Sequence, residues 1–144
     1  MIGLTWHQYG ADYSIEHGHL ANDDGLNTLV FMMLMTDARA KDSDELPPQA
    51  DRRGWPGDSF TQSPWGSRLW LLRREKLTNQ IVLKAKDFAT EALIPLLKGY
   101  VKSYRVAVSR PRRGWLRLDI HLTRPNNSTI DYGISMMWEA TYAV

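Results

Sequence analysis

The residue types that most often carry chemistry form only incomplete patterns in this chain. His17 and His19 flank a glycine, and on a strand both rings would point to one face, where they could bind a metal ion. Asp23 or Asp24 could add a ligand, but the neighbouring sequence offers no obvious full set. Exposed polar histidines are the simpler interpretation, and we expect no metal site.

Acidic residues cluster once in a pattern that resembles a cation site. Asp42, Asp44 and Glu45 look like the start of a calcium-binding loop. The glycine and the terminal glutamate that such a loop needs at fixed spacing are missing. We therefore expect a solvated acidic loop here.

Three further carboxylates lie near aromatic residues and could form the acid and base of a glycosidase: Asp51, Asp58 and Glu75. Each is also close to arginine, which would keep it ionised and unsuited to act as a general acid. The chain contains no cysteine, no phosphate-binding glycine loop, and no HExxH or GxSxG motif. We expect no catalytic residues and no cofactor.

A basic, aromatic turn carries the best signal for nucleic-acid binding. Arg110, Arg112 and Arg113 precede Trp115, and together they could contact a phosphate backbone. The whole chain, however, has 18 basic and 16 acidic residues and a formal net charge of only +2. A solvated hairpin tip is the simpler interpretation, so nucleic acid is an unlikely partner.

The densest group of unusual residues spans two segments, DRRGWPGD at 51–58 and GSRLW at 66–70. Arginine between carboxylates and indole rings can form bidentate ion pairs and stack at the same time. The group could fasten a long loop to its own domain, or present a contact surface, since Trp and Arg dominate interface energetics. We call it the loop cluster, and its members are Asp51, Arg52, Arg53, Gly54, Trp55, Asp58, Gly66, Ser67, Arg68 and Trp70.

Specific contacts are expected inside the loop cluster. Its three arginines should pair with Asp51, Asp58 or Asp37, and its tryptophans, Trp55 and Trp70, should be largely buried. If so, removing Arg68 should destabilise the fold, because breaking a buried ion pair leaves a charge without its partner.

The length and composition of the chain limit which folds are possible. The 144 residues suffice for one domain, 1–144, and 43% of them are hydrophobic, which is ordinary for a globular protein. No signal peptide is visible at the N-terminus. The longest apolar run, Leu29 to Met35, is far shorter than the roughly 20 residues that span a bilayer. We expect folding in the cytosol and no membrane partner.

The first two thirds of the sequence predict helices separated by a long loop. Residues 26–35 are apolar on nearly all sides and should form a buried helix, capped by an aspartate before it. Residues 38–62 show no period and should form a long structured loop. Ser63-Pro64 should start a second helix reaching Leu72, and Thr78 should start a third that Gly99 ends.

The last third predicts a three-stranded antiparallel meander. Apolar residues alternate from Tyr104 to Val108, from Leu116 to Leu122 and from Ile130 to Trp138, with turn residues at 110–114 and 125–128. Such alternation places one sheet face on the helices and leaves the other for water or a partner. The expected fold class is therefore α+β, with the helices first and the meander packed on them.

The last strand, Thr129 to Trp138, should be a sheet edge at which another chain docks. It has no lysine, arginine or proline, the residues that usually block strand addition. The alternative is that residues 12–17 or the tail 139–144 cover it within the monomer. The residues expected at the edge-strand docking site are Ile130, Tyr132, Ile134, Met136 and Trp138.

Four segments in this order resemble the Mu-like phage baseplate protein family, which also occurs in prophages and tailocins: residues 24–40, 51–58, 66–76 and 89–93. The combination of RRGW with GD and GSRLWLL carries most of this resemblance. Pro56 departs from it, since a second aromatic residue is expected there. The Glu-Pro-Arg signature of more distant relatives is also absent before the first C-terminal strand.

The resemblance implies a structural subunit, not an enzyme, in the virion tail baseplate of a contractile phage or tailocin tail. It implies larger baseplate wedge proteins and the tail sheath protein as partners, in multiple copies around a sixfold tail. It also implies that the subunit helps to start sheath assembly. The alternatives are a tail-associated cell-wall hydrolase and a small nucleic-acid-binding domain.

Overall fold

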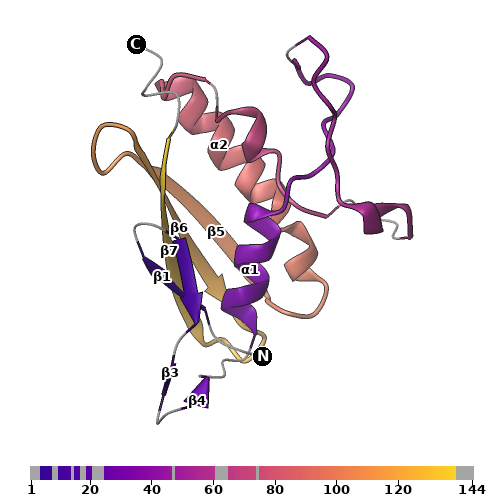
Figure 1. Ribbon diagram of the computed structural model, residues 1–144. Helices are drawn as coiled ribbons and strands as arrows, with labels where there is room; N and C mark the ends of the chain where they lie inside the picture. The colour runs from indigo at the N-terminus through magenta and orange to yellow at the C-terminus, as the bar shows by residue number, and fades with distance from the viewer. Residues whose placement is uncertain are drawn as a thin grey trace.

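The computed structural model describes the backbone of residues 4–7, 10–13, 15–16 and 19–20, and backbone and side chains of 25–46, 48–60, 65–73 and 75–138. In this part of the chain two α-helices precede a three-stranded antiparallel sheet (Figure 1), which confirms the expected α+β class.

Helix α1, Leu26–Met35, is the buried helix expected from its apolar sequence. Its residues Leu26, Val30, Met33 and Leu34 are all buried. The helix follows Gly25, whose φ of 80° suits glycine, and it ends where Thr36 becomes extended. The aspartates expected to cap it, at 23 and 24, lie outside the described residues.

The sheet consists of β5 (Ser103–Ser109), β6 (Trp115–Thr123) and β7 (Thr129–Met137), hydrogen-bonded in that order. The alternation predicted from the sequence is confirmed. On the central strand β6 every second residue is buried, because those side chains belong to the core shared with the helices. These buried residues are Leu116, Leu118, Ile120 and Leu122.

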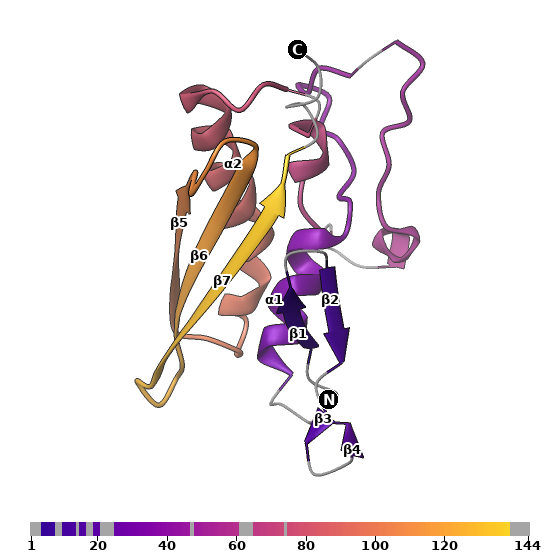
Figure 2. The same cartoon turned by 60° about the vertical axis from the view of Figure 1, so that its left-hand side comes forward.

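Helix α2, Asn79–Ala92, packs along the sheet next to β5 (Figure 2). It starts as expected at Thr78, whose side chain accepts a hydrogen bond from the Ile81 N–H. Its small residues Ala85, Ala89 and Ala92 are buried, which allows the helix to approach closely. The 3₁₀ helix η3, Ile94–Leu97, follows it.

Gly99 ends this helical segment as the sequence predicts. Its φ is +109°, and the next two residues, Tyr100 and Val101, both donate backbone hydrogen bonds to the Leu96 carbonyl. The chain then turns back into β5.

The helix expected from Ser63-Pro64 to Leu72 does not form in the described residues. Only a 3₁₀ turn, η2 (Leu69–Leu71), is present, and residues 61–64 lie outside the described part. Gly66 has a φ of +104° and Ser67 bridges to Asp37 in a parallel pairing. These backbone bonds replace helical ones, so the segment runs extended past the end of α1.

Two short hairpins precede α1: β1 (Leu4–His7) pairs with β2 (Gly10–Tyr13), and β3 (Ile15–Glu16) pairs with β4 (His19–Leu20). Tyr13 and Ile15 thus belong to two separate hairpins. In the described residues these strands pair with one another and not with β7.

The long loop leaves the body of the molecule as an arm. We define the arm as residues 41–60, which include the 3₁₀ helix η1, Pro56–Phe60. In Figures 1 and 2 this segment extends away from α2 and the sheet. The loop cluster lies at the base of the arm and along its returning half.

Candidate functional site

Ser67 joins the segment that follows the arm to the segment that precedes it. Its N–H donates to the Thr36 carbonyl at 2.9 Å, and its own carbonyl accepts from the Ala38 N–H at 3.0 Å. Its hydroxyl donates to the Leu34 carbonyl at 2.5 Å. Gly66 is required beside it, because a Cβ there would lie 2.5 Å from the Thr36 oxygen. This part of the loop cluster is a backbone clasp.

Arg53 makes one of the ion pairs expected from the sequence. Its guanidinium lies 2.5 Å from Asp37 and stacks over the Trp70 ring, 4.4 Å from the ring centroid. Trp70 in turn donates its indole N–H to the Ala38 carbonyl at 2.8 Å. Gly54, with a φ of +117°, turns the chain where it passes Arg39.

Arg52 bonds mainly to backbone and not to the expected carboxylates. It donates to the Lys41 carbonyl at 3.2 Å, and its ion pair at the same distance is with Asp42, whose side chain is fully exposed. Its own carbonyl accepts from the Ala40 N–H. Arg52 therefore links the outgoing and returning segments of the arm.

Arg68 has different partners from those expected. It donates to Asp44 and to Glu91, each at 2.7 Å, and its guanidinium covers the Phe88 ring at 4.1 Å. Its side chain is 13% exposed and that of Asp44 only 11%. Lys41 completes the group at 2.5 Å from Glu91. Arg68 thus fastens the arm to helix α2.

The charges in this group stabilise one another. Burial of Glu91 favours its neutral form, but hydrogen bonds from Lys41 and Arg68 outweigh burial and hold the pKa of Glu91 below its ordinary value. Burial likewise opposes the charge on Arg68, but hydrogen bonds to Glu91 and Asp44 raise the pKa of Arg68. Glu91 and Arg68 are therefore both charged at neutral pH, which suits an ion pair that fastens two segments and not proton transfer.

Trp55 and the two aspartates of the loop cluster differ most from expectation. Trp55 was expected to be buried but is 46% exposed, because its indole lies across Gly57 on the outside of η1. Asp58 accepts the Trp65 N–H at 2.8 Å, and Asp51 accepts the Arg53 N–H at 3.3 Å. Both carboxylates thus accept hydrogen bonds from backbone N–H groups.

A pocket of about 610 Å³ opens between the base of the arm and the end of α2. Small apolar residues, four cations and two carboxylates line it together: Ala38, Ala40, Ala92, Arg39, Lys41, Arg68, Lys98, Asp58 and Glu91. Phe88 and Ile94 also line this pocket.

The edge-strand residues separate into two sets. Side chains at even positions of β7 face the helices, and Ile134, Met136 and Trp138 are buried in the chain's own core. Ile130 and Tyr132 pack partly against it. These side chains therefore do not form an outward contact surface. The Trp138 indole also donates to the Glu75 carbonyl.

The backbone hydrogen bonds of β7 also alternate along the strand. Trp138 N–H bonds to the Gly114 carbonyl and Arg124 N–H to the Ser128 carbonyl, so even residues of β7 exchange hydrogen bonds with β6. The N–H and C=O groups of odd residues, such as Gly133 and Ser135, point away from β6. In the described part of the chain β7 is the last strand of its sheet.

Sequence reasoning missed Asp44 and Glu91, the partners of Arg68. Asp44 was read as part of a solvated loop, yet it is nearly buried. Glu91 lies on α2, 23 residues from Arg68, and its sequence neighbours resemble those of any exposed helical glutamate. No local pattern connects these positions, so only the folded arm reveals them.

None of the other candidate groups forms a binding or catalytic site in the described residues. His17 lies outside them, as does the side chain of His19. No group of three or more metal-binding side chains occurs among the residues that were described, and no helix there could cross a membrane. In the basic turn, Arg110 bonds to the Leu77 carbonyl and Asn79, and Arg112 stacks on Trp115.

Comparisons with known proteins agree on one family. The family model described as phage protein GP46 matches residues 26–129. The baseplate protein gp46 of Escherichia phage Mu is 43% identical over 133 residues, which cover 91% of this chain and 92% of that protein. The Mu-like prophage FluMu protein gp46 of Haemophilus influenzae is 34% identical over 130 residues, which cover 89% of this chain and 90% of that protein.

Proposed function

Because this chain belongs to the GP46 family of phage proteins, we propose that it is a structural subunit of a phage tail baseplate. The observation that carries this proposal is the 43% identity, over nearly the full length of both chains, to a protein named as a baseplate protein in phage Mu. Its place of action would then be the virion tail, with assembly in the host cytoplasm.

The finer role that we propose is to join larger wedge proteins and to start the sheath of a contractile phage or tailocin tail. Other baseplate wedge proteins and the sheath protein would be its partners, in copies that follow the sixfold tail. The loop cluster supports a structural role of this kind. Its ion pairs and backbone bonds fix the shape of a projecting arm, whereas an active site would hold groups poised for proton transfer.

For the sheath contact, we propose addition of a partner strand to the open side of β7. The odd residues of this strand direct their backbone groups away from β6, which is the geometry that strand addition requires. The open side carries no lysine, arginine or proline. The side chains facing the helices would stay in the core while the backbone pairs.

Proline substitution tests this contact, because proline removes one backbone N–H. Ser135→Pro would remove a group that points away from β6, whereas Ile134→Pro would remove a bond of the β6–β7 ladder. We expect Ser135→Pro to fold, to enter baseplates, and to leave tails without sheath. Ser135→Ala is the matched control and should support normal tails. Normal sheath on folded Ser135→Pro tails would exclude this docking site.

We further propose that the subunit is not an enzyme. Asp58 accepts a backbone N–H, Asp51 does the same, and Glu75 is exposed. Purified protein should release no soluble fragments from peptidoglycan, and neither Asp58→Asn nor Glu75→Gln should change that result. Release by the wild type, lost in either variant, would favour the cell-wall hydrolase.

A further inference from the structure

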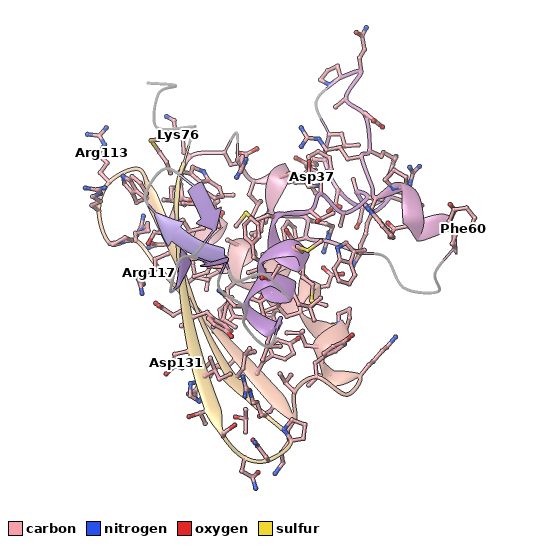
Figure 3. All side chains as sticks on the ribbon, turned by 60° about the horizontal axis from the view of Figure 1, so that its bottom comes forward. Asp37, Phe60, Lys76, Arg113, Arg117 and Asp131 are labelled. Atoms are coloured by element: carbon pink, nitrogen blue, oxygen red, sulfur yellow. The ribbon has the colours of Figure 1, made fainter. Side chains whose placement is uncertain are left out.

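The outer face of the sheet carries a cation with hydrogen-bond donors to spare. Arg117 of β6 and Asp131 of β7 both lie on the side that faces away from the helices (Figure 3). The Arg117 Nε donates to Asp119 at 2.9 Å, and the Arg117 side chain is 45% exposed. Within the part of the chain that the structure describes, no hydrogen bond joins its two terminal nitrogens to another residue. These N–H groups are available to a further acceptor.

Gly133 allows the Arg117 guanidinium to reach the last strand. It lies in the middle of β7, directly beside Asp119 of β6, and its φ is not positive, so the backbone conformation does not require glycine. A Cβ at position 133 would lie only 2.2 Å from the Arg117 Nη2. The guanidinium therefore occupies the space that a side chain would take. Glycine inside a strand often marks such a close approach.

A strand added to β7 would place one of its side chains next to this guanidinium. Paired strands lie about 4.7–4.9 Å apart, and residues that lie side by side project on the same face. The partner residue beside Gly133 would thus project on the outer face, and an aspartate or glutamate there would reach Nη2. A hollow of about 400 Å³, lined by Arg117, Asp131 and Gly133 among others, provides room for such a side chain.

Asp131 makes the charge of this edge depend on position. It lies two residues before Gly133 on the same face, it pairs with His121, and its side chain is 77% exposed. A slip of two residues would keep every partner side chain on its own face, but it would move a carboxylate from Arg117 to Asp131. Like charges directly opposite each other destabilise a sheet. The two charges can therefore distinguish registers that apolar alternation alone cannot.

This inference rests on the strand addition proposed above and names the chemistry of the partner. We propose that the added strand carries an aspartate or glutamate beside Gly133, and that this carboxylate pairs with Arg117 and fixes the register. Because the cation comes from β6, β7 itself stays without the lysine or arginine that would oppose strand addition.

Charge reversal with a matched control tests the pair in assembled tails. Arg117→Glu would bring two carboxylates together, whereas Arg105→Glu makes the same change on β5, at the other side of the sheet. Hydrogen bonds between charged groups change an equilibrium by about tenfold or more. We therefore expect sheathed tails, counted by electron microscopy, to fall about tenfold for Arg117→Glu and to stay normal for Arg105→Glu. Circular dichroism should show both variants folded.

Gly133→Ala tests the close approach without changing any charge. The added methyl group would displace the far end of the flexible Arg117 side chain, so the protein should fold and yet form fewer sheathed tails. Folded Gly133→Ala tails with normal sheath would overturn the proposed path of the guanidinium to the edge.

The outcomes separate this proposal from the docking site itself. Normal sheath on folded Arg117→Glu tails, while Ser135→Pro tails stay bare, would overturn the ion pair and leave strand addition in place. Normal sheath on both would exclude the docking site as well. Equal losses for Arg117→Glu and Arg105→Glu would indicate a general effect of charge and would also overturn the pair.

A cross-link can locate the partner carboxylate directly. The chain contains no cysteine, so Ser135→Cys provides a single attachment point on the outer face of β7. A short thiol-attached photo-cross-linker on the purified full-length subunit, followed by assembly into tails and mass spectrometry, identifies the partner residue beside position 135. We expect an aspartate or glutamate two residues away from that residue. A cross-linked segment without a carboxylate there, or no cross-link to another chain, would overturn the proposal.

Discussion

At the scale of single residues, the chain uses arginine mainly to fix the shape of a loop. Arg53 joins Asp37 and Trp70, and Arg68 joins Asp44 and Glu91. The residue types of the loop cluster could be predicted from the sequence, because Arg, Asp and Trp at short spacing favour stacking and ion pairing. The partners of Arg68 could not, since they come from segments that only the tertiary fold brings together.

Arg68→Ala should lower stability by about 3 kcal/mol, because it leaves the nearly buried Asp44 without its cation. For a domain of this size that corresponds to a fall in Tm of roughly 10 °C, measurable by circular dichroism. Arg39→Ala is the matched control, since the side chain of Arg39 is exposed and no ion pair of it occurs in the described residues. Equal Tm values for both variants would contradict a fastening role for Arg68.

Stability should also fall in acid through Glu91. The pKa of Glu91 is lowered in the folded chain from an ordinary value of 4.5, so its contribution is fully present above that pH. The contribution is lost as pH falls from there through the lower folded value. Urea unfolding as a function of pH should therefore show a smaller acid slope for Glu91→Gln than for the wild type. An unchanged slope would place the acid sensitivity elsewhere.

At the scale of elements, the periodicity of apolar residues in the sequence predicts the sheet well and the arm poorly. The alternation from Leu116 to Leu122 corresponds to strand β6, since opposite faces of a strand meet different environments. The helix expected to reach Leu72 failed because the Ser67 backbone bonds across to Thr36 and Ala38. Local helix-start signals cannot compete with such long-range backbone pairing, and they give no indication of it.

Two glycine substitutions can test why glycine is required at position 66, next to the pairing of Ser67 with residues 36–38. Gly66 and Gly99 have similar φ values, +104° and +109°, but only at Gly66 would a Cβ meet another atom, the Thr36 oxygen at 2.5 Å. Gly99→Ala should cost about 1–2 kcal/mol from backbone strain alone. Gly66→Ala adds a backbone collision and should be clearly more destabilising in urea unfolding. Equal losses would mean that strain, not close approach, selects glycine at both positions.

At the scale of the whole molecule, one core connects all the major elements. Buried residues of α1, α2, η3 and the three strands belong to one hydrophobic cluster. The expectation of a single domain therefore predicts one cooperative unfolding transition. Far-UV circular dichroism and tryptophan fluorescence should give the same urea midpoint. Two separated midpoints would indicate that the parts before and after the arm unfold independently.

The consecutive order β5–β6–β7, with α2 packed directly on β5, has a consequence for how the chain folds. Contacts between neighbours along the sequence close short loops, and low contact order favours fast folding. We expect residues 79–137 to form the nucleus, with φ-values well above zero at positions such as Leu118. The clasp at Ser67 spans the arm and should form after the rate-limiting step. Substitutions in the arm would then mainly accelerate unfolding, so the arm can vary while the folding rate is maintained.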